Sequence, residues 1–455
     1  MIINKPLDSS KKQLFRKLIT IALPVSVQSL LSFSVNLLDN MMLGSLGEVQ
    51  ISAASQANQF FFMLSLMISG IVGGSNVLVA QFWGCKKKDS ISGILAYTYR
   101  IAIAFALLLT VLGAVFPHQV LSIFSADRAV IDEGARYLRI VAISYVFYTI
   151  TSVTTGTLRC VSNVHVSVIL SAISLVISAS LNWVLIFGNL GAPSLGIVGA
   201  AVSTLIARLV EFTLAMLYMK FKEKQLKIRV KELLHWDKRL AKKYYSNTVP
   251  VILNEFFWAV GSWVLAAIMG RIGTSFVAAN SIFNTTSQIA GVLGTGLSAA
   301  GAVMIGNAIG SGETEHPLLI KRQLQIVGLA AGIFSAVLIL VMRPFMLMIY
   351  NVSDITLICT NQMMWVGAAI QVFKTMQTMN MMGILRGGGD AAFVMVNDII
   401  FLWVLAVPLG FLAGLVWDLP VPIVFFILNI EQPIKFFTSA FRLRRNKWIT
   451  NVTAY

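Results

Sequence analysis

The sequence predicts an all-α polytopic membrane protein, with twelve transmembrane helices in two related six-helix lobes around a central cavity. The first observation is composition. Hydrophobic residues make up 57% of the chain and charged residues 12%, against about 25% charged residues in ordinary soluble domains. The second is a series of apolar segments that are each long enough to cross a bilayer. The third is an internal repeat that relates the two halves of the chain.

The first apolar segment covers residues 18–43, longer than the roughly 20 residues that a spanning helix needs. Its polar residues Ser29, Ser32, Asn36 and Asp39 follow one another at steps of three, four and three, so they share one face of a helix. A carboxylate in a spanning segment costs at least about 2.5 kcal/mol and usually faces a bundle interior or a water-filled path. Asp39 therefore indicates an ion or proton site, with a structural hydrogen bond inside the bundle as the alternative.

Eleven further apolar segments of spanning length follow the first. In order they cover residues 52–82, 94–116, 134–158, 164–188, 195–219, 244–270, 277–309, 323–348, 359–384, 392–416 and 419–441. The only long basic connection lies between the sixth and seventh segments. We therefore expect an N-lobe at residues 18–219, a linker at residues 220–243 and a C-lobe at residues 244–441.

The net charge of +16 is concentrated between the apolar segments. Basic residues gather in residues 1–17, in the linker 220–243 and in the tail 442–455. These segments lie on one side of the membrane if the helices alternate in direction, and the positive-inside rule places them, with both termini, in the cytoplasm. We interpret the charge as a sign of cell-membrane topology and of attraction to anionic lipids, and not of nucleic-acid binding.

The two halves of the chain repeat at a nearly constant offset. A shift of 226 positions aligns Pro24 with Pro250, Gly44 with Gly270, Asn58 with Asn284 and Gly84 with Gly310, and a shift of 227 aligns Asp127 with Asp354, Gly156 with Gly383 and Leu158-Arg159 with Leu385-Arg386. Each repeat holds six helices, an even number, so the two are parallel repeats about an axis along the membrane normal. The cavity between the two lobes is the expected substrate site.

Three stretches resemble the multidrug and toxic compound extrusion (MATE) family, and the resemblance covers essentially the whole chain. They are the helix from Pro24 to Asp39, the run Gly199-Ala200-Ala201, and residues 383–390, which read GILRGGGD. The resemblance implies secondary active export of organic cations by a monomeric protein with alternating access, in exchange for sodium ions or protons. A lipid or lipid-linked oligosaccharide flippase of the same superfamily is the alternative. An enzyme is not expected, because no Ser/His, paired-Asp or metal spacing falls at membrane depth.

The resemblance also implies a cation site in the N-lobe. Asp39, Asn182 and Thr204 match ligands that one branch of the family uses, and Asn36 shares the polar face of Asp39. The second Asp of that branch is replaced by Ile186. One carboxylate with amide and hydroxyl oxygens suits a sodium ion, and a single desolvated carboxylate equally suits a proton. No cofactor is expected beyond this coupling ion.

The C-lobe has its own carboxylate, Glu255 on the seventh helix, which we expect to face the cavity. Where another branch of the family has an Asp on the tenth helix, this chain has Lys374 or Thr375. We therefore predict a buried ion pair between Glu255 and Lys374. Further candidates for the wall of the cavity or for substrate contact are Trp258, Gln371, Thr375, Met376 and Met379, with core packing as the alternative for the methionines.

Two other features complete the expectations. Pro24 lies fifteen residues before Asp39 in the same helix, so it can act as a hinge but cannot touch the ion. The intramembrane charges Glu431 and Lys435, and likewise Arg208 and Glu211, are spaced for pairing along one helix. Asp398 is expected either to cap a neighbour or to line the path. The cysteines Cys85, Cys160 and Cys359 are isolated in sequence and predict free thiols.

Overall fold

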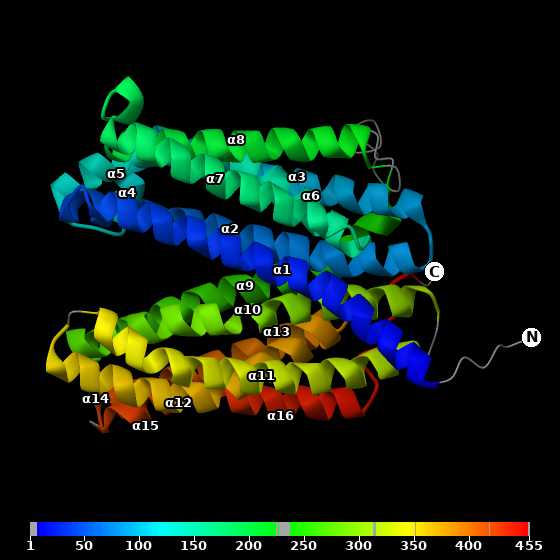
Figure 1. Ribbon diagram of the computed structural model, residues 1–455. Helices are drawn as coiled ribbons and strands as arrows, with labels where there is room; N and C mark the ends of the chain where they lie inside the picture. Colours follow the sequence, from blue (N-terminus) through cyan, green and yellow to red (C-terminus); the bar gives the residue numbers. More distant parts are fainter. Residues whose placement is uncertain are drawn as a thin grey trace, which may run out of the picture. The chain divides into compact units, whose positions relative to one another are not determined.

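The computed structural model describes residues 7–223, 226, 237–312, 315–350, 352–417 and 419–453, with side chains from residue 12 onward. Over these residues the chain is all helical, without a strand (Figure 1). Eleven helices are long and apolar enough to cross a membrane, and a bent pair brings the total to twelve if it forms one span. The predicted all-α architecture with twelve spans is thus confirmed. Most of the linker, residues 224–225 and 227–236, lies outside the described residues.

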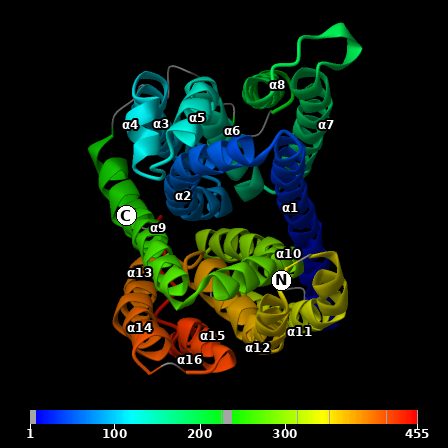
Figure 2. The same ribbon diagram turned by 90° about the vertical axis from the view of Figure 1, so that its left-hand side faces the viewer.

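The first half of the chain forms eight helices. They are α1 (Leu7–Gly44), α2 (Glu48–Gly84), α3 (Lys88–Val115), α4 (Pro117–Ser122), α5 (Arg128–Val141), α6 (Ser144–Cys160), α7 (His165–Phe187) and α8 (Ile197–Phe221), with a short 3₁₀ turn at Asn189–Gly191. Helices α7 and α8 pack along each other, as both views show (Figures 1 and 2). An α-helix rises about 1.5 Å per residue. With 38 and 37 residues, α1 and α2 are therefore longer than a helix needs to be to cross the core of a bilayer.

The second half repeats this pattern with more breaks. Its helices are α9 (Lys238–Ile272), α10 (Thr274–Gly310), α11 (His316–Ile349), α12 (Asp354–Thr378), α13 (Ala391–Ile400), α14 (Val407–Leu415), α15 (Val421–Leu428) and α16 (Glu431–Arg444). Two π-helical segments, Met379–Leu385 and Phe401–Ala406, extend α12 and α13. Such wide turns are rare and often occur at functional sites.

The fourth predicted span is not one straight helix. It is formed by α5 and α6, which bend by 50° across Ala142 and Ile143. The carbonyl oxygens at the bend have side-chain donors: the Thr110 hydroxyl donates to Ala142 at 3.0 Å and the Ser144 hydroxyl donates to Val141 at 2.6 Å. A helix can break inside a membrane protein when the freed carbonyls are satisfied in this way. The apolar length of the sequence shows the span but not the break.

By its contacts, the described chain divides into two units. The C-terminal unit holds residues 1–26, 80–87 and 249–455, and the N-terminal unit holds residues 27–79 and 88–248. These limits differ from the lobes expected at 18–219 and 244–441, because α1, α2 and α9 each pass from one unit to the other. The boundary between the two units falls two residues after Pro24 in α1 and two residues before Pro250 in α9.

Small residues allow these helix ends to pack closely inside the C-terminal unit. A side chain on Gly296 of α10 would meet the backbone of Ala22 and Ser26 of α1, and one on Gly310 would overlap the backbone of Gln81 of α2. Close backbone approach at glycines is the usual way in which membrane helices gain van der Waals contact. The Ser26 hydroxyl also donates to the carbonyl of Val292 at 3.2 Å. The start of α1 is therefore held on α10.

The tail after α16 is ordered against the turn that follows the first π-helical segment. The Thr450 amide donates to the Gly388 carbonyl at 2.9 Å, and Trp448 is fully buried. The Gln81 side chain donates to the Thr450 carbonyl at 3.1 Å and accepts from the Val452 amide at 2.9 Å. Residues 388–390 of the GILRGGGD run thus form a docking turn for the tail.

Candidate functional site

The predicted cation site begins with a hydrogen bond between two helices. The Asn182 side-chain amide of α7 donates to the Asp39 carboxylate of α1 at 2.5 Å. Asn182 is fully buried, whereas Asp39 is half-buried. The same amide has a second polar atom, its oxygen, which is buried without a hydrogen-bond partner. A buried acceptor without a donor is costly, so this oxygen has the chemistry of a ligand for a small cation or a protonated group.

Ser178 lies beside this pair, and Tyr137 links it to Thr204. The Thr204 hydroxyl of α8 donates to the Ala200 carbonyl at 3.0 Å, which leaves its oxygen free to accept. The Tyr137 phenol of α5 lies beside Thr204 and within the electrostatic reach of Asp39, and the Ser178 hydroxyl of α7 lies beside Asp39. Carboxylate, amide and hydroxyl oxygens are hard ligands of the kind that bind hard monovalent cations. The residues that the sequence named here, Asp39, Asn182 and Thr204, therefore fit a sodium ion or a proton.

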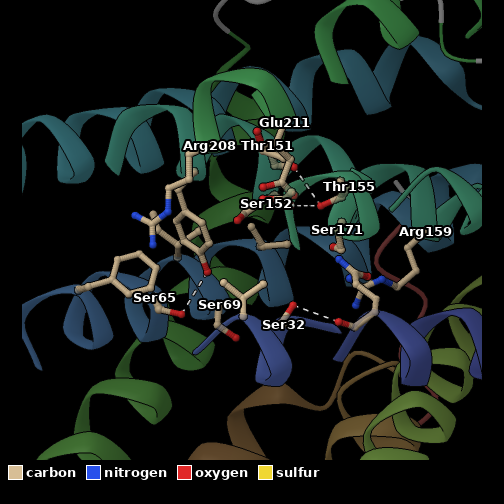
Figure 3. Close-up of a pocket in the computed structure, with 18 of the residues that line it drawn as sticks. Ser32, Ser65, Ser69, Thr151, Ser152, Thr155, Arg159, Ser171, Arg208 and Glu211 are labelled. Atoms are coloured by element: carbon tan, nitrogen blue, oxygen red, sulfur yellow. Dashed lines mark hydrogen bonds between the residues drawn. The ribbon is translucent and has the colours of Figure 1, made fainter. Parts of the chain in front are cut away.

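A cavity of about 520 Å³ lies in the N-terminal unit next to this cluster. Its wall comes from α1, α2, α6, α7 and α8, and it includes the predicted polar residues Ser32 and Asn36 but not Asp39. Asn36 donates to the Ser32 carbonyl at 3.1 Å. Hydroxyl groups dominate the wall, as Figure 3 shows for Ser65, Ser152 and Thr155 among others. Of the predicted polar face of the first helix, Ser32 and Asn36 thus line the cavity, and Ser29 and Asp39 do not.

Arg208 has a different role from the one that its spacing suggested. Its spacing predicts an ion pair with Glu211 along α8. The two side chains do not come within ion-pair distance, and their charges interact only at longer range. Its guanidinium instead donates to the Ser144 hydroxyl at 2.8 Å and lies 4.0 Å from the centre of the Phe61 ring. An arginine stacks well on aromatic faces because its charge is delocalised and weakly hydrated. The bend between α5 and α6 brings Ser144 within its reach.

In the C-terminal unit Glu255 is paired, but not with the predicted residue. Both terminal nitrogens of Arg386 lie 3.2 Å from one oxygen of Glu255, and both side chains are largely buried, at 14% exposure for Glu255 and 11% for Arg386. Lys374 instead donates to the Ser287 hydroxyl at 3.4 Å. The predicted pair of Glu255 with Lys374 is therefore wrong.

The physical reason is an offset along the tenth span. Arg386 lies twelve residues beyond Lys374, which is about 18 Å along a helix. The π-helical segment ends with the Arg386 amide donating to the Met381 carbonyl at 2.9 Å, and this places Arg386 opposite the middle of α9. Counting residues from the helix ends does not show which level of the tenth span, beyond the end of α12, meets Glu255.

The remaining cavity candidates of the C-lobe lie mostly in a packed core. Gln371, Thr375, Met376 and Met379 are all buried, and Gln371 accepts a hydrogen bond from Ser287 at 3.0 Å. The burial of the two methionines fits the core-packing alternative. A place of Gln371 and Thr375 in a cavity wall stays a prediction. Trp258 is exposed at 39%, so its role as a contact for substrates stays a prediction.

The predicted pair of Glu431 with Lys435 is confirmed at 2.7 Å, and it has a third member. The Asp398 carboxylate lies 2.9 Å from the same ammonium group. All three side chains are buried. Asp398 therefore binds a lysine across two helices, which neither of its predicted roles describes. The three cysteines are free thiols, as predicted.

Sequence reasoning missed three residues of the N-terminal unit. Arg208 follows Thr204 by four residues, and this shared helix face was a signal that could have linked it to the cation site. Arg159 matches Arg386 in the repeat, which was a second signal. Tyr137 gave no signal, because it lies on a short amphipathic helix whose neighbours only the fold defines.

Comparison with known proteins adds the family. The profile of the family described as MatE matches residues 24–184 and 250–412. The chain is similar to the multidrug resistance protein NorM of Vibrio vulnificus, with 25% identity over 406 residues that cover 88% of this chain and 87% of NorM. A crystal structure of MATE in complex with MaL6 has the same fold, with a TM-score of 0.85 at 14% identity over 94% of this chain and 96% of that one. A crystal structure of MATE in the bent conformation has a TM-score of 0.84 at 14% identity, over 96% of this chain and 97% of that one.

Proposed function

Because the chain belongs to the MatE family, we propose that it exports small molecules across the cell membrane by exchange with an inward-moving cation. Its similarity to a multidrug resistance protein supports multidrug efflux by a multi-pass membrane transporter. Organic cations such as drugs and dyes are the proposed substrates. We place both termini in the cytoplasm, on the basis of the charge distribution, and take the functional unit to be a monomer.

The observation that carries the coupling proposal is the cluster around Asp39. A carboxylate that accepts from a buried amide, with an unpartnered amide oxygen and a hydroxyl oxygen nearby, has the composition of a site for one small cation. In the proposed cycle, a sodium ion or a proton neutralises Asp39 and changes the relative stability of two conformations. Because a ligand shifts an equilibrium only by its differential affinity for the two states, the cation must bind one state more tightly.

The proposed hinge is the proline in α1. Pro24 lacks a backbone donor and leaves one carbonyl without its helical partner, and the helix changes from one contact unit to the other two residues later. A solved MATE is described in a bent conformation. Since Pro24 and Asp39 are about 22 Å apart along a helix, the proline can respond to the cation only through bending.

The experiment is transport by the purified protein in lipid vesicles. A cationic dye is placed on one side, and a sodium gradient or a proton gradient is imposed separately. The proposal expects one of the two gradients to drive the dye against its concentration difference, with protein-free vesicles as the control. Dye movement that neither gradient alters contradicts cation coupling.

A further inference from the structure

The C-terminal unit has a surface groove that is separate from the charged clusters described above. Its volume is about 490 Å³, and its lining residues come from α13 and from the second half of α16, which Figure 1 shows in orange and red. Three of them are phenylalanines, Phe393 of α13 and Phe437 and Phe441 of α16. Phe437 is exposed at 62% and Phe441 at 57%. Because both helices belong to segments that are apolar and long enough to cross a membrane, these rings have lipid as their natural surroundings.

Two arginines of α16 lie at the same groove. Arg442 and Arg445 both line it, and the three-residue step between them keeps them on one face of the helix. The guanidinium carbon of Arg442 is 5.1 Å from the centre of the Phe393 ring, and that of Arg445 is 4.4 Å from the centre of the Phe441 ring. Arginines at the end of a spanning helix commonly lay their stems on apolar surface and hold the charge at the membrane boundary. The groove therefore joins an aromatic wall to a cationic end.

The charges at this end do not cancel. The Arg442 Nε donates to the Asp390 carboxylate at 2.7 Å, and its two terminal nitrogens donate to none of the described residues. The Arg445 side chain makes no ion pair or hydrogen bond in the part of the chain that the structure describes. One carboxylate thus serves two guanidinium groups, and the groove keeps one positive charge without a counter-ion.

The internal repeat shows that this charge belongs to one half of the chain. The shift of 227 positions places Asn163 at Asp390, Ala215 at Arg442 and Tyr218 at Arg445. In the N-terminal unit the Asn163 amide donates to the Tyr218 phenol at 2.6 Å, so neutral groups bond directly where the C-terminal unit has two arginines. The arginine pair is therefore a local feature and does not follow from the repeat.

We propose that this groove binds one anionic phospholipid, with its phosphate on Arg442 and Arg445 and its acyl chains along the three phenylalanines. Guanidinium groups donate well to phosphate oxygens, and basic pockets between spanning helices are typical sites for anionic headgroups. A phosphodiester with an uncharged headgroup carries one negative charge, which matches the one unneutralised positive charge of the groove. A choline headgroup would add a cation beside two arginines. The aromatic wall favours a lipid over a free phosphate ion, because such an ion would make no use of the rings.

Binding of this lipid does not depend on the proposed transport function. The proposed orientation, with the end of α16 in the cytoplasm, would put the site in the cytoplasmic leaflet of the membrane. Both statements can be tested apart from each other, because binding is measured on purified protein without a gradient.

Native mass spectrometry of the protein in detergent measures the affinity for the first bound lipid. Phosphatidylglycerol and phosphatidylcholine with the same acyl chains are the two probes, so only the headgroup charge differs between them. Glycerol 3-phosphate, which has the phosphate but no chains, is added as a competitor. The wild-type protein is expected to bind phosphatidylglycerol several-fold more tightly than phosphatidylcholine, and glycerol 3-phosphate is expected not to displace it.

Substitutions at the groove separate the charge from the apolar wall. Arg442→Gln and Arg445→Gln should each weaken phosphatidylglycerol binding by about fivefold, the factor expected for one basic side chain beside an anionic lipid. Binding of phosphatidylcholine should change by less than about twofold. Phe437→Ala should weaken the binding of both lipids equally, because it removes only apolar contact. Arg444→Gln is the matched control, since Arg444 is an exposed arginine of the same helix end that does not line the groove.

Three results would overturn the proposal. The first is equal affinity of the wild-type protein for the two lipids, and the second is an equal effect of Arg444→Gln and Arg445→Gln, which would show unspecific attraction to a basic surface. The third is displacement of phosphatidylglycerol by glycerol 3-phosphate, which would make the site one for a soluble phosphate. Arg442→Gln can destabilise the fold through the loss of its bond to Asp390, but Arg445 has no such bond, so Arg445→Gln decides the question independently. Thermal unfolding of each variant is recorded beside the binding data.

Discussion

The side-chain nitrogen of Asn182 lies 2.5 Å from a carboxylate oxygen of Asp39, and this contact joins α7 to α1. The two residues are 143 positions apart, so the fold alone brings them together. The donor orients one oxygen of the carboxylate and leaves the amide oxygen of Asn182 without a partner. A cation between these oxygens would tie α1 to α7, and its release would free them.

Asn182→Ala tests whether the amide belongs to the cation site. The substitution removes the donor to Asp39 and the unpartnered oxygen together. We expect the cation concentration for half-maximal export to rise by about tenfold, with the dye affinity nearly unchanged, because the lost contacts are to the cation and to Asp39. Asn189, a half-buried residue that follows α7 and whose side-chain amide donates to the Trp183 carbonyl at 2.9 Å, offers a matched control in Asn189→Ala. A change in dye affinity alone would speak against the assignment.

Substitutions of Thr204 in α8 test the same site. A matched pair of them distinguishes the effect of losing the hydroxyl from the effect of changing the shape of the side chain. Thr204→Ser keeps the oxygen, whereas Thr204→Val keeps the branched shape and removes it. Export by the serine protein should need about the same cation concentration as the wild type, and the valine protein several times more. Equal behaviour of the two variants in cation titrations would exclude the hydroxyl as a ligand.

The Glu255–Arg386 pair is expected to stabilise the fold, because each buried charge neutralises the other. Removing one partner of a buried pair leaves a charge without compensation and costs about 3–5 kcal/mol. Glu255→Gln and Arg386→Gln should therefore each lower the unfolding temperature more than the double variant does. The surface pair of the half-buried Glu133 with the exposed Arg136 serves as the control cycle, with an expected coupling of about 0–1 kcal/mol. Additive single effects at Glu255 and Arg386 would show that the two groups do not interact.

The sequence predicts the helical architecture well because each span carries its own signal. A run of apolar residues indicates a spanning helix whatever its neighbours are, and the steps between Ser32, Asn36 and Asp39 indicate a shared face. The spans hold in the structure, and Ser32 and Asn36 of the predicted face line one cavity, whereas Asp39 does not. The break at Ala142 could not be predicted in this way, because it depends on the Thr110 hydroxyl of another helix.

Pairing between helices was predicted poorly for the same physical reason. Periodicity gives the face of a helix but not the level at which a neighbouring helix meets it, so it pairs Glu255 with Lys374, whereas the partner in the structure is Arg386. By contrast, the pair of Glu431 with Lys435 lies within one helix, where spacing alone sets the distance. The repeat carries further information, since it aligns Arg159 with Arg386.

Substitution of Pro24 tests whether α1 bends at this residue during transport. Pro24→Ala restores a backbone donor and should straighten and stiffen α1. We expect the export rate to fall several-fold, while the affinity for the cation stays the same, since the proline is about 22 Å from Asp39 along the helix. The repeat provides a comparison at Pro250 of α9, which lies at the second passage between the contact units. Unchanged transport rates in Pro24→Ala vesicles would remove bending at this position from the cycle.

The central claim is that Asp39 couples a cation to export, and gradient-driven transport by Asp39→Asn in lipid vesicles tests it most directly. Asparagine keeps the shape of the side chain and removes the charge that a cation would neutralise. We predict a protein that inserts, folds and binds the dye, but whose gradient-driven dye export falls to the level of protein-free vesicles. Export at the wild-type rate by a well-folded Asp39→Asn protein would contradict the account.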